Sequence, residues 1–146
     1  MRIRPLLLAT ALVVMPVAAG AQQAITGLGQ SWPNSTDVSS SPNYHVYVFQ
    51  RGNTRYVQVN DANGNVRGAF ARTPYSIIGL PVGADAANLA TQDEPLPPAT
   101  NTSSEKVYED SGIKVFVSPQ PSGAYRVMAV SGDCKGDPQE CTTHSP

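Results

Sequence analysis

Side chains that could bind a ligand alternate with valines between residues 44 and 71. Alternation of this kind is typical of a half-buried strand, in which every second side chain lies on the same face. A face that carries aromatic rings, amides, an imidazole and a guanidinium could hydrogen-bond a sugar, a peptide or a carboxylate. The candidate ligand-binding residues are His45, Tyr47, Tyr56, Gln58, Asn60 and Arg67.

Three strand-like stretches must position these side chains. Residues 44–50, 54–60 and 66–71 are rich in the β-branched and aromatic residues that favour strands. Gly52-Asn53 and Asn63-Gly64 stand between them, and both dipeptides are good two-residue hairpin turns. The sequence therefore predicts a three-stranded antiparallel meander.

Two tight turns would fix the register of this meander, with Phe49 facing Tyr56 and Asn60 facing Arg67. A bulged turn at residues 61–65 is the alternative, and it would shift the third strand. The candidate binding face is then either open to solvent or covered by the segment that precedes the meander. The opposite face should form the core, through Val46, Val48, Val57, Val59, Val66 and Phe70.

The remaining chain reads as further short strands at hairpin spacing. Asp85 could cap a single helical turn over residues 86–90. The fold class predicted is all-β: a small antiparallel sandwich or open barrel of six or seven strands, built from meanders. The further strands are expected at residues 75–80, 106–109, 113–117 and 124–130.

Composition shifts divide the chain into four parts. Residues 1–21 read as a signal peptide, and residues 22–42 form an irregular N-terminal arm in which Trp32 is expected to plug one end of the core. Residues 43–130 form the β-domain, with a Pro-rich loop at 92–104. Residues 131–146 form a largely unpacked tail closed by a disulfide between Cys134 and Cys141.

The leader indicates export, with a periplasmic or secreted location after cleavage. Its apolar stretch, Leu6–Met15, would form a helix of about 15 Å, which is half the thickness of a bilayer's hydrocarbon core. Stable membrane insertion is therefore not expected. Removal of Arg2 and Arg4 with the leader moves the formal net charge from −1 to −3, which excludes a basic nucleic-acid binder.

Neither a metal nor a cofactor is expected. Asp61–Asn65 matches the first half of a calcium-loop pattern, but Val66 stands where the pattern needs glycine, and Arg72 where it needs a bidentate glutamate. The chain also lacks a nucleophile elbow, a His-Glu-x-x-His helix and a phosphate loop. An enzyme is therefore not expected, although one without a recognisable motif stays open.

A non-catalytic binding protein of the bacterial cell envelope is the function these features favour, with a sugar, a peptide or a protein as partner. Ser122-Gly123-Ala124-Tyr125 resembles the Ser-Gly-x-x-Tyr loop of periplasmic lysozyme inhibitors, although it is one residue shorter. The cysteines do not bridge sheet to terminus as in that family. This resemblance of four residues implies an alternative, in which residues 119–125 enter the cleft of a lysozyme or protease.

Overall fold

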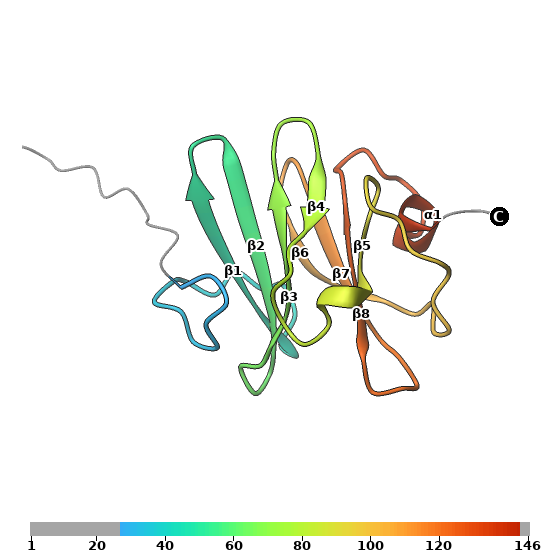
Figure 1. Cartoon of the computed structure of the whole chain (residues 1–146), viewed down its shortest axis with the longest axis horizontal. Helices are drawn as coiled ribbons and strands as arrows, with labels where there is room; N and C mark the ends of the chain where they lie inside the picture. The colour runs from blue at the N-terminus through green and yellow to red at the C-terminus, as the bar shows by residue number, and fades with distance from the viewer. Residues whose placement is uncertain (1–26, 144–146) are drawn as a thin grey trace, which may run out of the picture.

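Eight strands form two four-stranded sheets, which face each other across the core (Figure 1). The computed structural model describes residues 27–143, so the expected leader, the first residues of the expected arm and His144 lie outside the described residues. The first sheet has the order β1-β2-β3-β4: β1 (Tyr44–Arg51), β2 (Thr54–Asp61), β3 (Val66–Arg72) and β4 (Ile77–Gly79). The second has the order β5-β8-β7-β6: β5 (Leu89–Thr91), β6 (Glu105–Glu109), β7 (Lys114–Pro119) and β8 (Tyr125–Val130).

The predicted all-β sandwich is confirmed, with one strand more than expected. The additional strand is β5, which pairs in parallel with β8, so the second sheet is mixed rather than purely antiparallel. The predicted helical turn before it is a 3₁₀ turn over Ala86–Asn88. Asp85 precedes this turn, but its side chain makes no capping hydrogen bond and has a different role, described below. Within residues 27–143, no helix has the length and apolar character needed to cross a membrane.

The predicted register is confirmed between β1 and β2, where Phe49 faces Tyr56. It is wrong at one end of the β2–β3 pair, because Asn60 faces Val66 rather than Arg67. The carboxylate of Asp61 accepts the backbone N–H groups of Asn63 and Asn65, at 2.9 and 3.0 Å, which holds a turn longer than two residues. The bulged alternative is therefore correct, and one extra residue of β3 opposes β2.

The core lies between the sheets and is built mainly from valine. Val57 and Val59 are fully buried, as the alternation predicted, and Phe70 is buried beside them. The second sheet adds its own inward-facing aliphatic residues. The residues contributed by that sheet are Leu89, Val107, Ile113, Val115, Val117, Val127 and Ala129.

Loops close both lateral openings between the sheets. On one side the arm bonds to each sheet, because the N–H of Val38 donates to Val46 O and the N–H of Ser40 donates to Val107 O, both at 2.8 Å. On the other side, the outward N–H groups of Ile77 and Gly79 donate to the carboxylates of Asp93 and Glu94, each at 2.7 Å. These contacts occupy strand-edge groups that would otherwise be open to pairing with another chain.

The C-terminal tail is packed on the domain, so the expectation of a largely unpacked tail is wrong. The expected disulfide between Cys134 and Cys141 is present. Between the cysteines the chain enters α1 (Pro138–Thr142), whose first turn is capped by the side chain of Asp137. Pro138, Gln139 and Thr142 are buried, and helix α1 contacts β5 and β8.

Asp110 organises the turn between β6 and β7. Burial raises the pKa of its carboxyl, but hydrogen bonds from the Gly112 N–H, the Tyr108 hydroxyl and the Arg55 guanidinium outweigh burial and leave the pKa below its usual 3.8. A carboxyl whose pKa is lower in the folded state than in the unfolded state stabilises the fold at pH values above its pKa in the unfolded state. This stabilisation is lost as the pH falls through its pKa in the folded state.

Asp110→Asn is therefore expected to lower stability at neutral pH and to weaken the loss of stability on acidification below about pH 4. Urea unfolding at pH 3 and pH 6 measures both effects. Asp133→Asn, at an exposed aspartate whose side chain has no ion pair within the described part of the chain, is the matched control. If Asp110→Asn lost as much stability between pH 6 and pH 3 as the wild type does, the role of the Asp110 carboxylate in stabilising the fold would be contradicted.

Candidate functional site

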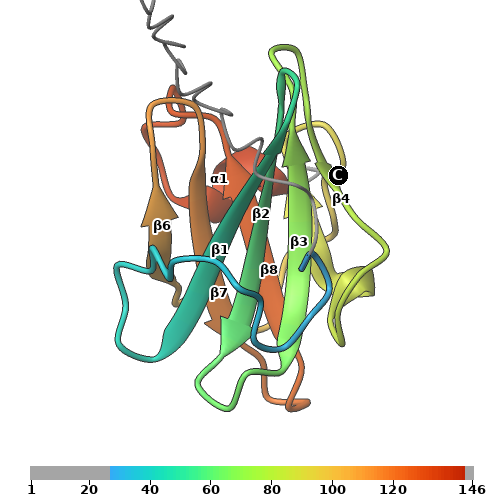
Figure 2. The same cartoon turned by 90° about the vertical axis from the view of Figure 1, so that its left-hand side faces the viewer.

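The predicted binding face of β1–β3 is covered by the arm, which crosses in front of these strands (Figure 2). Gln58 and Asn60 are 0% exposed. Gln58 accepts the N–H of Gly29 at 2.6 Å and donates to Gln30 O at 2.8 Å, while Asn60 donates to Ser31 O at 2.6 Å. The open surface expected at these two residues is therefore not present, and the covered alternative is the correct one.

Arg67 is separated from the other predicted site residues. The bulge in β3 turns its side chain towards the second sheet, where Nε lies 2.8 Å from Oδ2 of Asp85. The guanidinium also lies over the ring of Tyr125, 4.2 Å from its centroid. Arg67 thus takes part in the contact between the sheets and does not join His45.

The contact between Arg67 and Tyr125 also involves the loop that resembles the motif of the lysozyme inhibitors. Tyr125 is only partly exposed, and its ring is held between the Arg67 guanidinium and the ring of Tyr44, with a centroid distance of 6.2 Å to the latter. Burial raises the pKa of Tyr44 to about 12, with a further contribution from Tyr125. A tyrosine packed in this way does not project into a partner's cleft, so this geometry gives the inhibitor alternative no support.

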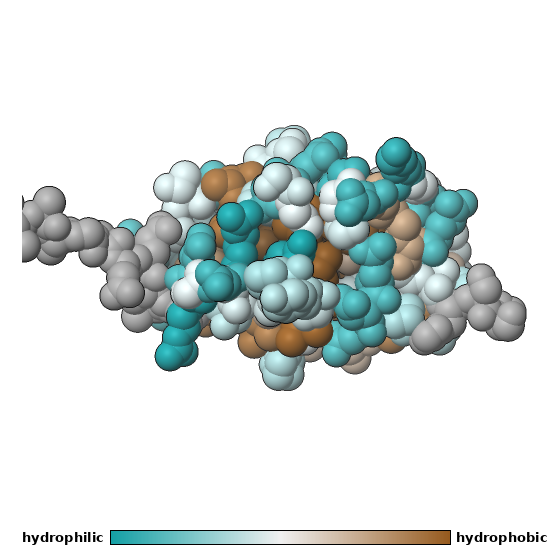
Figure 3. Space-filling view, turned by 90° about the horizontal axis from the view of Figure 1, so that it is seen from above, coloured by the Kyte–Doolittle hydropathy of each residue, from teal (hydrophilic) through white to brown (hydrophobic). Residues whose placement is uncertain are grey.

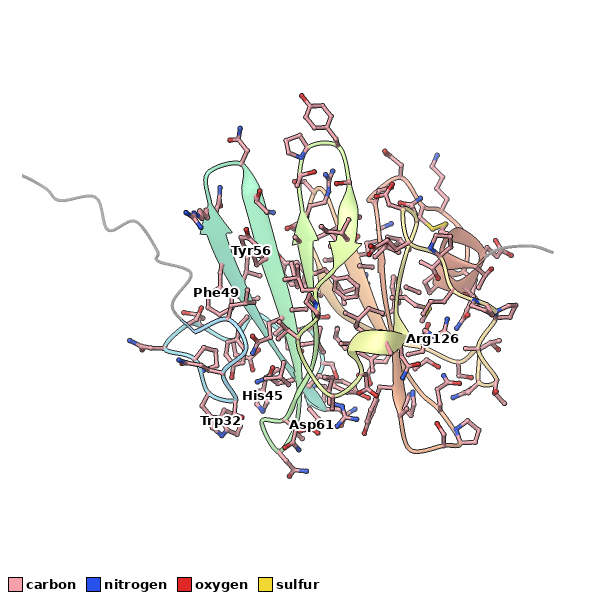
Figure 4. All side chains as sticks on the ribbon, viewed as in Figure 1. Trp32, His45, Phe49, Tyr56, Asp61 and Arg126 are labelled. Carbon is pink, nitrogen blue, oxygen red and sulfur yellow. A yellow bond between two sulfur atoms is a disulfide. The ribbon has the colours of Figure 1, made fainter. Side chains whose placement is uncertain are left out.

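The two predicted tyrosines on the covered face differ in position. Tyr47 is buried next to His45, and the two rings are nearly parallel with centroids 6.4 Å apart. Burial raises the pKa of Tyr47, as does the negative charge of Asp37. Tyr56 is half-buried and lies further along the sheet, away from His45 (Figure 4). Tyr47 therefore supports His45, whereas Tyr56 stands apart.

His45 keeps part of its side chain open to solvent, and the arm brings two partners to it. Nδ1 of His45 lies 2.7 Å from Oδ2 of Asp37, and the Trp32 ring meets the imidazole edge-on with centroids 5.1 Å apart (Figure 4). We call Trp32, Asp37 and His45 the Trp32 patch. It is the candidate functional site.

The indole of Trp32 is exposed but held in place. The residue is 58% exposed, so the expectation that it plugs an end of the core is wrong. Its ring lies directly on Gly64, where a Cβ atom would come within 2.5 Å of it. Gly64 also has a φ of +84°, which disfavours other residues. Contacts with Gly64 and His45 thus fix the ring while more than half of the residue faces solvent.

Asp37 orients the imidazole. Burial raises the pKa of the Asp37 carboxyl, but hydrogen bonds from the N–H groups of Val46 and Ser39 and the contact with His45 lower it by more than that. The pKa therefore lies below its usual value, and the group is a carboxylate. A carboxylate only accepts hydrogen bonds, so Nδ1 of His45 carries a proton in this contact. When the imidazole is neutral, Nε2 is the nitrogen that can accept a hydrogen bond from a bound hydroxyl.

The amides of Gln58 and Asn60, on β2, hold the backbone that carries Trp32. They bond to the backbone of residues 29–31, which directly precede Trp32. Sequence reasoning placed these two amides correctly on the face of His45, but it missed the roles of Trp32 and Asp37. The sequence signal for Trp32 was a lone indole in a polar segment, followed by Pro33.

The patch offers two kinds of contact to a ligand: the apolar ring of Trp32 and the hydrogen-bonding nitrogen Nε2 of His45. No Ser, Thr or Cys side chain within residues 27–143 hydrogen-bonds to His45. Among the same residues, no group of three or more His, Cys, Asp or Glu side chains could hold a metal ion. Comparisons with protein-family models, curated proteins and solved structures gave no match to this chain.

Proposed function

We propose that this protein is a non-catalytic saccharide-binding protein of the bacterial cell envelope, and that the Trp32 patch is its binding site. The observation that carries the proposal is the exposed indole fixed edge-on against His45. Large exposed aromatic residues that are already ordered lose little conformational entropy on binding. They are also the residue type that most often dominates binding energy.

The chemistry of the patch favours a neutral, hydroxyl-bearing ligand. The indole offers an apolar surface, and Nε2 of His45 accepts a hydrogen bond, which matches a sugar ring with its C–H faces and hydroxyl groups. The carboxylate of Asp37, 2.7 Å from the imidazole, disfavours an anionic ligand at the same place. These features favour a saccharide over the peptide or carboxylate that the sequence left open.

The proposal includes export to the periplasm or beyond. The leader-like residues 1–21 support it, and the Cys134–Cys141 disulfide suits an oxidising compartment. Cell fractionation with an antibody against the protein tests this part separately. Recovery of a shortened chain from the periplasm or medium is expected, and a full-length chain confined to the cytoplasm would overturn it.

Binding should be visible through Trp32 itself, because the chain holds one tryptophan. We expect N-acetylglucosamine oligomers to shift or quench the fluorescence of the purified protein in a saturable way. By isothermal titration calorimetry, Trp32→Ala should weaken binding by at least about tenfold, the effect of losing a residue that dominates binding energy. Asp37→Asn should weaken it less, because the indole stays in place and only the hydrogen bonding of His45 changes.

The matched control is Tyr75→Ala, which removes another exposed aromatic side chain far from the patch. This variant should bind the oligomers as the wild type does. The absence of any saccharide binding, or equal affinity in Trp32→Ala and Tyr75→Ala, would show that the patch does not bind sugars.

A further inference from the structure

A second surface with interaction features lies along the outer side of β4. The turn that precedes β4 presents Tyr75, which is 94% exposed. This turn lies at the end of the molecule seen in Figure 3, where hydrophilic residues cover most of the surface. Ile78 in β4 is also exposed, although it is a large apolar residue. Tyr75 and Ile78 are two of the four large apolar residues that are exposed within residues 27–143, and they lie three positions apart in the chain.

The backbone on either side of Tyr75 is held by the hydrogen bonds of a turn. The side-chain oxygen of Thr73 accepts the N–H groups of Tyr75 and Ser76, at 3.2 and 3.0 Å. The N–H of Thr73 donates to Ser76 O at 2.9 Å, and Pro74 restricts the backbone between them. The turn therefore fixes the backbone position from which Tyr75 projects, which lowers the entropy cost of ordering this segment against a partner.

An apolar hollow of about 510 Å³ opens at the other end of β4. Its volume is in the range of sites that take up a side chain or a small ligand. One carboxylate, that of Glu94, lies at its wall, held through Oε2 by the N–H of Gly79 at 2.7 Å. The apolar lining consists of Leu80, Pro81, Ala86, Ala87, Leu89, Pro95 and Leu96.

The projection and the hollow carry complementary groups. Next to Tyr75, Arg72 donates through Nε to Gly112 O at 3.1 Å, and its guanidinium has no carboxylate within 4 Å among residues 27–143. At the hollow, Oε1 of Glu94 forms no hydrogen bond with the described part of the chain. A two-fold axis across β4 would bring Arg72 and Tyr75 of one chain to Glu94 and the hollow of the other. Both contacts would form twice, which is the self-complementarity that a symmetric dimer requires.

We propose that the outer side of β4 is a dimerisation surface, in which Tyr75 of each chain enters the apolar hollow of a second copy and Arg72 pairs with Glu94. Strand pairing across β4 is not the mode of contact, because Asp93 and Glu94 already occupy its outward N–H groups. The tyrosine ring is buried among Leu80, Ala87 and Leu96 of the other copy, and its hydroxyl donates to Oε1 of Glu94.

Sedimentation velocity of the purified protein over a concentration series tests this dimer. The wild type should form a concentration-dependent dimer. Tyr75→Ala, which lacks the projection, and Ala87→Trp, which fills the hollow, should each raise the dimer dissociation constant at least tenfold. Lys106→Ala, at an exposed position on β6, which packs beside β1 rather than β4, should dimerise as the wild type does, and circular dichroism should show all variants folded.

Mixing the two defective variants gives the sharper test. Tyr75→Ala keeps an open hollow and Ala87→Trp keeps the projection, so an equimolar mixture should regain association through one contact, weaker than the two of the wild type. Three results would overturn the proposal: a wild type that stays monomeric at every concentration, a dimer insensitive to both substitutions, or a mixture that does not associate. In the first case the hollow or Tyr75 would serve a different ligand or protein.

Discussion

Replacement of Asp85 by alanine is expected to destabilise the fold by about 3 to 5 kcal/mol, the usual cost of removing one partner from a buried ion pair. Asp85 is 3% exposed and connects the two sheets. Its Oδ1 accepts the N–H of Tyr125 at 2.9 Å, and its Oδ2 lies 2.8 Å from Nε of Arg67. Alanine would leave the Tyr125 N–H without its acceptor, and the Arg67 guanidinium with only the Asp61 carboxylate, whose Oδ2 lies 3.5 Å from Nη1.

Arg67 and Asp85 form an ion pair, but the Nε–H of Arg67 does not point at Oδ2 of Asp85 in a direction that makes a hydrogen bond. The charge of Asp85 should therefore matter more than its hydrogen-bonding geometry at Oδ2. Asp85→Asn retains an acceptor for Tyr125 and should lose less stability than Asp85→Ala. The double variant Arg67→Met, Asp85→Leu removes both charges and should recover part of the loss.

Urea unfolding of these variants measures the effect. A loss below about 1 kcal/mol in Asp85→Ala, the range of an exposed ion pair, would contradict a bridging role for this carboxylate.

Replacement of Gln58 by alanine is expected to cost about 2 to 4 kcal/mol, since each buried group left without its partner costs about 1 to 3 kcal/mol. Gln58 forms three hydrogen bonds, of 2.6 Å with Gly29, 2.8 Å with Gln30 and 2.9 Å with Asn60. The first two attach the arm to β2. Their loss should loosen the segment that carries Trp32.

Trp32 fluorescence reports this loosening independently of stability. In Gln58→Ala the emission should move to longer wavelength, as the ring leaves His45 and Gly64, and acrylamide should quench it more readily. Gln50→Ala is the matched control, because its side chain is exposed and makes one bond of 3.3 Å, to Gly52 O. Unchanged stability and emission in Gln58→Ala would mean that this amide does not hold the arm.

The meander was predictable because its information is local. The Gly52-Asn53 turn and the alternating valines together leave one register for β1 and β2, and this register is observed. The turn at 61–65 departs from the prediction because the carboxylate of Asp61 accepts two backbone N–H groups and lengthens it. That added residue reversed the side on which Arg67 lies, so a small change in a turn removed one residue from the candidate site.

The covering of the predicted face could not be seen in the pattern. Amides such as Gln58 and Asn60 give the same alternation whether they meet water, a ligand or a backbone segment. The arm has no periodicity that would have assigned it to this face. β5 was missed for a related reason, since three residues that pair in parallel with a distant strand carry little local signal.

The most direct measurement for the binding proposal is a set of amide proton–nitrogen correlation spectra during titration with N-acetylglucosamine oligomers. The single indole N–H of Trp32 gives its own signal. We expect the largest shifts at that indole and at the backbone of Asp37, His45 and Gly64, with little change along β4. Saturable shifts centred on any other part of the surface, or spectra that do not change at all, would contradict the assignment of saccharide binding to the Trp32 patch.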